Sequence, residues 1–175
     1  MPRTITTTVY EFEELDDDAK QNAIESHNLA RAGEGSPWEH EWRDTLNTAI
    51  QALDLEHRNW YLETESLTPR DRAVGELEGV RAWKWLHNND VPEVIGEIGS
   101  CPFTGYCGDE SFLEPLRTFL RRPEAGTDLD QLFRECLQSW ARDWEADDEY
   151  QRSEEVVSGL LVDECVEFTK DGERV

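Results

Sequence analysis

Basic residues are scarce in this sequence of 175 residues. Lys and Arg together number 17 against 40 Asp and Glu, which leaves a formal net charge of −23. Three of the basic residues are Lys: Lys20, Lys84 and Lys170. A chain with this imbalance is repelled by other polyanions and attracts cations and basic proteins. We therefore expect no direct binding to DNA, to RNA or to anionic membranes.

Long apolar runs are also missing. No segment approaches the roughly 20 consecutive apolar residues that a membrane-spanning helix needs, and residues 1–8 lack the apolar segment of a secretory signal peptide. These absences predict a cytoplasmic protein, in which cysteines are normally reduced. The four thiols are Cys101, Cys107, Cys136 and Cys165. A disulfide between the first two is the alternative.

Motifs of catalysis and metal binding are absent as well. The sequence has no Walker loop and no GxSxG, HExxH or zinc-deaminase pattern, and no EF-hand spacing of acidic residues. Cys101 and Cys107 are six residues apart, which is not a CxxC pair, and no His lies near them. We therefore predict a protein that is not an enzyme, with no catalytic residues, no bound metal and no cofactor.

Aromatic residues are plentiful. Seven Trp, six Phe and four Tyr supply enough bulky apolar surface for a packed core, and a chain of this length fits one compact domain. We predict a single domain over residues 1–175. It would contain a mixed strand and helix half at 1–90, a loop at 91–109, a helical acidic half at 110–164 and a C-terminal strand at 165–175.

Three segments have the composition of β-strands. Residues 4–12 are β-branched and aromatic, residues 59–66 alternate between two faces, and residues 165–169 precede a turn that contains glycine. The second strand should pair with the first, and the third should add to the same sheet. The predicted fold class is α+β, with a small, mainly antiparallel sheet packed against five or six helices.

Capping residues and apolar stripes mark the helices. One stripe comprises Trp38, Trp42, Leu46, Ala49 and Leu53, and it predicts a helix that faces the core. Ser36, Pro37 and Glu39 form a capping box at the start of that helix. Pro115 is compatible with a helix only in the first turn. The predicted helices cover about 16–30, 37–53, 76–87, 110–122, 128–150 and 153–164.

Acidic side chains are distributed over the whole chain. Each successive window of about 30 residues has a net charge between −2 and −5, so the charge belongs to the folded body and not to a tail. The long helix ends in acidic residues, at the negative pole of its dipole, where cations are preferred. Such departures from local preference are typical of functional sites. Two alternatives remain open: fraying of this helix end, and an acidic composition that reflects a saline habitat.

Three short segments carry a resemblance to a known group of proteins. They are residues 9–15 (VYEFEEL), residues 103–110 (FTGYCGDE), and residues 167–172 (EFTKDG), the last preceded by Ser-Glu-Glu at 153–155. Together they resemble segments of small acidic proteins encoded by bacteriophages and prophages, some of which are labelled antitoxin-like. The resemblance implies a phage setting, inside an infected bacterial host, where small acidic proteins often act as counter-defence factors.

The charge and the resemblance together favour an inhibitor with a DNA-like surface. DNA carries a negative charge about every 1.7 Å of its axis, and its binders present rows of Lys and Arg. Carboxylates three or four residues apart on a helix are about 5–6 Å apart and could meet such rows. The predicted partner is a basic nucleic-acid-binding host protein. The predicted contact residues are Glu135, Glu145, Asp147, Asp148 and Glu149, with Asp16, Asp17 and Asp18 as a second patch.

The alternative hypothesis is an antitoxin-like or other protein-interaction module that binds one partner through residues 101–112. This stretch holds two cysteines and two glycines and separates the two halves of the chain. Phe103, Tyr106 and Phe112 would be the anchors, because aromatic residues dominate the binding energy of many interfaces. The acidity of the chain would then be incidental.

Overall fold

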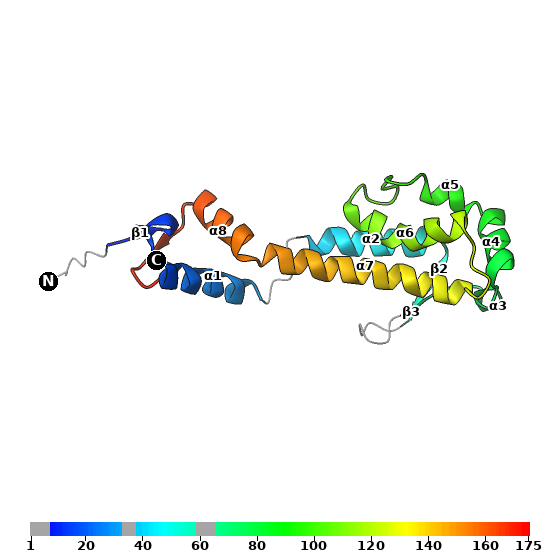
Figure 1. Cartoon of the computed structure of the whole chain (residues 1–175), viewed down its shortest axis with the longest axis horizontal. Coiled ribbons are helices and arrows are strands. Elements are labelled where there is room, and N and C mark those ends of the chain that lie inside the picture. Colours follow the sequence, from blue (N-terminus) through cyan, green and yellow to red (C-terminus); the bar gives the residue numbers. More distant parts are fainter. Residues whose placement is uncertain (1–7, 33–37, 59–65) are drawn as a thin grey trace. The chain divides into compact units, whose positions relative to one another are not determined.

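The computed structural model describes residues 8–32, 38–58 and 66–175, and its fold class is α+β, as predicted (Figure 1). In chain order the elements are β1 (Tyr10–Glu11), the 3₁₀ helix η1 (Phe12–Glu14), α1 (Asp17–Arg31), α2 (Glu39–Ala52), β2 (Leu55–Arg58), β3 (Ser66–Pro69), α3 (Arg72–Gly75), α4 (Gly79–Asn88), α5 (Val91–Ile95), α6 (Cys107–Arg121), α7 (Leu129–Gln151), α8 (Glu154–Asp163) and β4 (Glu167–Phe168). The described residues thus contain eight α-helices, where five or six were predicted.

The strands of the described residues form two separate antiparallel pairs. β1 pairs with β4, so the N-terminal and C-terminal strands share a sheet as predicted. β2 pairs with β3, so the prediction of one sheet is wrong. Two neighbouring segments close into a pair at a lower cost in chain entropy than two distant ones. Most of the strand predicted at 59–66 lies outside the described residues, and Ser66 begins β3 opposite Arg58.

The chain divides into two compact units. Unit 1 comprises residues 1–37 and 147–175, and unit 2 comprises residues 38–146, so the boundary lies within α7. Counted from the sequence, unit 1 carries a net charge of −12 and unit 2 a net charge of −11. The prediction that residues 1–175 form one domain stays a prediction.

Unit 1 is built from α1, α8 and the β1–β4 pair. Asp16 and Ser153 cap the two helices: Asp16 Oδ1 accepts from the Ala19 amide at 3.0 Å, and Ser153 Oγ accepts from the Val156 amide at 3.4 Å. Both caps satisfy a backbone N–H that the helix itself leaves unpaired. The core side chains include Phe12, Leu15, Ile24, Val157, Leu161 and Phe168.

Unit 2 has a larger core, to which α2, α6 and α7 contribute. The Trp140 indole N–H donates to the Trp42 carbonyl oxygen at 3.1 Å, and the two indole rings are 6.2 Å apart. This contact holds α7 against α2. The predicted stripe of α2 is buried from Trp42 to Leu53, whereas Trp38 is 43 % exposed. Trp38 precedes the first residue of α2, and its side chain therefore falls outside the stripe. Ser36 and Pro37 of the predicted capping box lie outside the described residues.

Three local predictions about unit 2 are wrong. The helix predicted at 76–87 begins three residues later, as α4 at Gly79, whose φ of +51° lies outside the helical region, and the short helix α3 (Arg72–Gly75) before it was not predicted. The predicted loop at 91–109 contains α5 and the start of α6. Pro115 lies in the interior of α6 and not in its first turn, because α6 begins at Cys107.

Candidate functional site

The predicted acidic patch at the start of α1 is exposed. Asp16, Asp17 and Asp18 lie together there, and all three side chains are open to solvent. Asp16 is the helix cap, and the two residues that follow lie in the first turn, where the helix dipole stabilises negative charge. The patch therefore has a structural role as well as an exposed charge.

The acidic residues predicted on α7 are divided between the two units. Glu135 and Glu145 belong to unit 2, whereas Asp147, Asp148 and Glu149 belong to unit 1. Glu135, Glu145 and Glu149 are exposed. The Glu135 carboxylate also accepts from the Gln131 amide nitrogen at 2.9 Å.

Two of the unit 1 residues at the end of α7 are held by neighbours. The Asp148 carboxylate accepts from Arg152 Nε at 2.9 Å, and Asp147 Oδ1 accepts from the Gln151 side-chain amide at 3.4 Å. Arg152 therefore offsets part of the negative charge that the sequence places at this helix end. This end of α7 presents less free charge than the sequence predicts.

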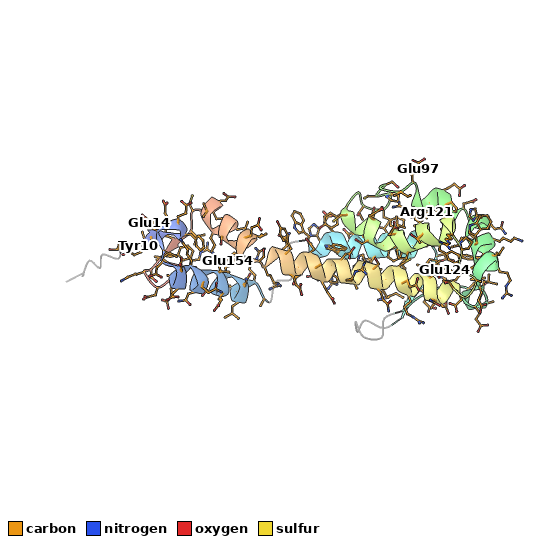
Figure 2. The ribbon with its side chains drawn as sticks, in the orientation of Figure 1. Tyr10, Glu14, Glu97, Arg121, Glu124 and Glu154 are labelled. Atoms are coloured by element: carbon orange, nitrogen blue, oxygen red, sulfur yellow. The ribbon has the colours of Figure 1, made fainter. Side chains whose placement is uncertain are left out.

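A further acidic surface, which the sequence analysis missed, lies on the β1–β4 pair. Glu11 of β1 is directly opposite Glu167 of β4, and both side chains are exposed. Like charges that face each other across two strands destabilise a sheet. Glu13 and Glu14 follow in η1, where Oε2 of Glu14 (labelled in Figure 2) accepts from the Glu11 amide at 3.0 Å. We call Glu11, Glu13, Glu14 and Glu167 the strand-pair acids.

Ion pairs offset little of the charge in unit 1. One ion pair joins described residues of this unit, the pair between Asp148 and Arg152. The strand-pair acids form none within the described residues. In unit 2 the described residues form several, such as the pair between Glu39 and Arg43 at 2.6 Å. Unit 1 thus presents its negative charge to solvent with little compensation.

The central stretch at 101–112 is organised around a buried carboxylate. Asp109 is completely buried. Its Oδ2 accepts from the backbone amides of Phe103, Thr104 and Gly105 at 2.8, 2.9 and 3.3 Å. Its Oδ1 accepts from the hydroxyl groups of Thr45 and Thr104 at 2.9 and 2.8 Å. These five hydrogen bonds join the loop, α2 and α6, and they explain the FTGYCGDE sequence as a structural motif.

Gly108 allows α6 to lie close to α2. A Cβ atom at this position would lie 3.0 Å from Trp42 Cε3 and 3.2 Å from Thr45 Oγ1, closer than ordinary van der Waals contact. Any larger residue would require the side chains of Trp42 and Thr45 to move by a few tenths of an ångström. Glycine at this position therefore keeps Asp109 within hydrogen-bonding distance of Thr45.

A second buried charge fixes the first half of the same loop. Arg117 of α6 is 4 % exposed. Its Nη2 donates to the Ile95 carbonyl oxygen at 2.6 Å and to the carbonyl and hydroxyl oxygens of Ser100, both at 2.9 Å. Its Nη1 donates to Glu110. Arg117 thus holds the segment from Ile95 to Ser100 against α6.

The three aromatic residues of the alternative site have different positions. Phe112 is completely buried in the core of unit 2, so it offers no surface to a partner, and its prediction as an anchor is wrong. It lies on the apolar face of α6 with Leu113 and Leu116. Phe103 and Tyr106 are half-buried. The exposed Trp38 stacks on Tyr106, with ring centres 6.4 Å apart.

Two of the cysteines, Cys101 and Cys136, do not show the features of an activated nucleophile. All four are free thiols. Burial raises the pKa of the Cys136 thiol. Burial, with the nearby carboxylates of Asp109 and Glu110, also raises the pKa of Cys101. A raised pKa disfavours the thiolate, which is the reactive form.

Within the described residues no group of His, Cys, Asp or Glu side chains could hold a metal ion. None of the helices in this part of the chain has the length and the apolar composition that a membrane span requires.

Comparisons with protein-family models, with curated proteins and with solved structures find no match to this chain.

Two of the residues that organise the central loop could have been found from the sequence. Asp109 follows the Thr104–Gly105 turn and lies in the first turn of α6, where carboxylates often accept backbone N–H groups. Arg117 lies four residues after Leu113, on the apolar stripe of α6. A charged residue at a core position indicates a buried polar network.

Proposed function

We propose that this chain is an acidic binding protein that inhibits a basic, nucleic-acid-binding host protein by occupying its nucleic-acid-binding surface. The observation that carries this proposal is the exposed, largely unpaired charge of unit 1. Its net charge is −12, and one ion pair joins its described residues. A surface of this kind repels nucleic acid and attracts arrays of Lys and Arg.

The strand-pair acids support the same conclusion. A sequence selected for stability alone would not place Glu11 opposite Glu167, because this arrangement costs stability. Glu11 and Glu14 also form a capping box on η1, but within the described residues no ion pair offsets the two facing carboxylates, and such an unfavourable local choice is typical of a functional surface. We therefore assign the contact surface to the strand-pair acids and to Asp17 and Asp18 at the start of α1.

The resemblance to phage and prophage proteins suggests that the chain acts inside an infected bacterium. The partner would be a basic defence protein of an infected bacterium, met in the cytoplasm. Such a partner normally binds the regularly spaced phosphates of DNA. The acidic side chains of unit 1 would take the place of those phosphates and prevent the partner from binding nucleic acid.

The proposal is tested by capture of partners from bacterial lysate at two salt concentrations. We expect the tagged chain to retain basic nucleic-acid-binding proteins at low salt, and duplex DNA to compete with them. Exposed charges more than about 10 Å apart are largely screened at 0.1 M salt, so affinity should fall steeply as salt is raised. Binding that does not depend on salt, or that DNA does not compete with, would contradict the proposal.

A neutralised variant tests the location of the contact surface. Replacing Glu13 and Glu167 with Gln, and Asp17 and Asp18 with Asn, removes four exposed charges from unit 1. Each exposed ion pair contributes about 0.2–1 kcal/mol, so we expect the captured partner to bind at least about tenfold more weakly. The measurement is a fluorescence anisotropy titration of the labelled chain with that partner.

The matched control removes the same number of charges from unit 2. Its four exposed positions are Glu76, Glu93, Glu97 and Glu124, of which Glu97 extends into solvent in Figure 2. With Gln at these positions we expect the affinity to change by less than about threefold. Equal weakening of both variants would show that the total charge, and not unit 1, determines binding.

A second candidate function rests on the aromatic surface of unit 2. Trp38 is 43 % exposed, and it stacks on Tyr106 beside the loop that Asp109 organises. Exposed Trp and Tyr side chains dominate many interfaces, so this surface suits a single protein partner. The observation that favours this candidate would be a captured protein that stays bound at high salt.

Substitution of Trp38 by Ser distinguishes the two candidates. Because Trp38 precedes α2 and is largely exposed, we expect thermal unfolding to change little. If the aromatic surface binds the partner, the affinity measured by calorimetry should fall about 30-fold or more, since an aromatic residue at the centre of an interface contributes about 2 kcal/mol or more. An unchanged affinity would exclude Trp38 from the interface.

A further inference from the structure

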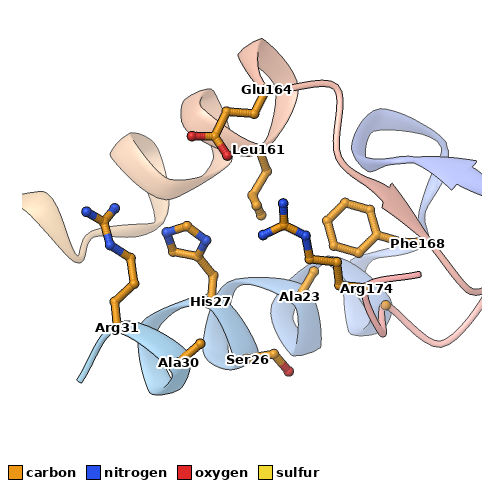
Figure 3. A pocket seen from close by; sticks show the side chains of 10 residues that line it. Ala23, Ser26, His27, Ala30, Arg31, Leu161, Glu164, Phe168 and Arg174 are labelled. Carbon is orange, nitrogen blue, oxygen red and sulfur yellow. The ribbon is translucent and has the colours of Figure 1, made fainter. Parts of the chain in front are cut away.

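A pocket in unit 1 brings basic side chains together in an otherwise acidic unit. It has a volume of about 440 Å³ and is lined by residues of α1, of the end of α8 and of the C-terminal segment. Figure 3 shows the guanidinium groups of Arg31 and Arg174 on either side of the His27 imidazole, with the Glu164 carboxylate near them. Two of the five described Lys and Arg residues of unit 1 thus line one pocket.

Neither guanidinium group is neutralised by a contact. Within the described residues, Arg31 and Arg174 form no ion pair and no side-chain hydrogen bond, although Glu164 lines the same pocket. The backbone around Arg174 is fixed: Arg174 forms a bridge with Phe168, and the Val175 amide donates to the Glu167 carbonyl oxygen at 3.0 Å. Arg31 is half-buried and Arg174 is exposed, and a guanidinium group without a counter-ion can bind an anion.

The charges and the lining determine which anion fits. With His27 neutral, two guanidinium groups and one carboxylate leave one net positive charge, which a monoanion balances. The rest of the lining has the apolar side chains of Ala23, Ala30, Leu161 and Phe168, together with Ser26 and Gly172. Guanidinium groups bind planar carboxylates through two parallel hydrogen bonds. An apolar body would contact the wall while its carboxylate reached the arginines.

We propose that the pocket between α1, α8 and the C-terminal segment binds a small organic monocarboxylate through Arg31 and Arg174. The carboxylate lies between the two guanidinium groups, and the apolar part of the ligand contacts Leu161 and Phe168. This site is separate from the acidic contact surface, so binding of the ligand does not depend on the proposed inhibition of a basic protein.

His27 makes the binding depend on pH. Burial lowers its pKa below the ordinary value of 6.5; Arg31 and Arg174 lower it further, and Glu164 opposes them. The imidazole is therefore neutral at pH 7. It gains a proton as the pH falls and then adds a third positive charge to the pocket. A bound carboxylate favours this charged form and raises the pKa of His27, so affinity should increase as the pH falls below 7.

The test uses benzoate as the probe, with neutral benzamide and inorganic phosphate as comparisons. We expect saturable binding of benzoate in NMR titrations of the full chain, with the largest shifts at His27 and Leu161, and an upward shift of the His27 pKa. Benzamide should bind at least about tenfold more weakly, because a charge-assisted hydrogen bond contributes about 1.5–3 kcal/mol. Equal binding of benzamide, or tighter binding of phosphate, would overturn the assignment.

Four variants assign the site. Arg31→Gln and Arg174→Gln should each weaken benzoate binding about tenfold or more, whereas Glu164→Gln should strengthen it by removing a competing negative charge. Lys170→Gln is the matched control, since Lys170 is an exposed cation of the same unit outside the pocket. Far-UV circular dichroism confirms that each variant is folded. Equal effects of Arg31→Gln and Lys170→Gln, or no saturable benzoate binding, would overturn the proposal.

Discussion

Replacement of Asp109 by Ala is expected to lower the free energy of unfolding by about 3–5 kcal/mol, because buried polar groups that lose their partner keep the full cost of desolvation. The substitution leaves three backbone amides and two hydroxyl groups without the carboxylate that they contact at 2.8–3.3 Å. It also releases the loop that carries Phe103 and Tyr106. Urea unfolding, followed by Trp fluorescence, measures the change.

Asp109→Asn separates the shape of the side chain from its charge. The Asn oxygen can replace Oδ2, which accepts the three backbone amides. Its NH₂ group then faces the hydroxyl groups of Thr45 and Thr104, which can rotate to accept. We expect Asn to cost about 1–2 kcal/mol, less than Ala.

Asp44→Ala is the control for Asp109, because Asp44 is an exposed acidic residue of α2 in the same unit. It should change stability by less than about 0.5 kcal/mol. If Asp109→Ala were no more destabilising than Asp44→Ala, the carboxylate would not organise the loop in solution.

Arg117→Ala is expected to destabilise the protein by a similar amount, about 3–5 kcal/mol. It removes the donor to the Ile95 and Ser100 carbonyl oxygens and leaves a cavity in a buried position. Arg117→Met keeps the length of the side chain and should cost less. Hydrogen exchange of the backbone amides at 96–101 should become faster in both variants, because this segment loses its attachment to α6.

Arg121→Ala provides the control for Arg117. Arg121 lies one turn further along α6, where it forms an exposed ion pair with Glu114 at 3.4 Å, and such pairs contribute less than about 1 kcal/mol. Its loss should leave exchange at 96–101 unchanged. Equal losses of stability at positions 117 and 121 would contradict the role that we assign to Arg117.

Asp109 and Arg117, the two buried charged residues, support the surface that the second candidate function uses. The loop between α5 and α6 is fixed at both ends, by Arg117 near Ile95 and by Asp109 near Thr104. The aromatic surface formed by Trp38 and Tyr106 is therefore presented on a fixed support, which lowers the entropy cost of binding a partner. A loss of partner binding in an Asp109 variant would thus report on the support, whereas a loss in a Trp38 variant reports on the contact itself.

The sequence alone determined the elements that depend on local chemistry. The helix that starts after Asp16, the one that starts after Ser153 and the long helix to about residue 150 were all predicted from caps and apolar spacing, and the structure confirms them as α1, α8 and α7. The fold class and the net charge also followed from the sequence. The helices depend on residues that are close together in the chain, and the net charge depends on composition alone.

The tertiary structure decided what joins distant segments. In the folded chain Phe112 is buried and Trp38 is exposed. The Thr45 hydroxyl donates to the Asp109 carboxylate, and Glu11 lies opposite Glu167. The tertiary structure also gathered His27, Arg31 and Arg174 around one pocket from both ends of the chain. Local spacing carries no information about such contacts, because they arise only when helices and strands far apart in sequence pack together.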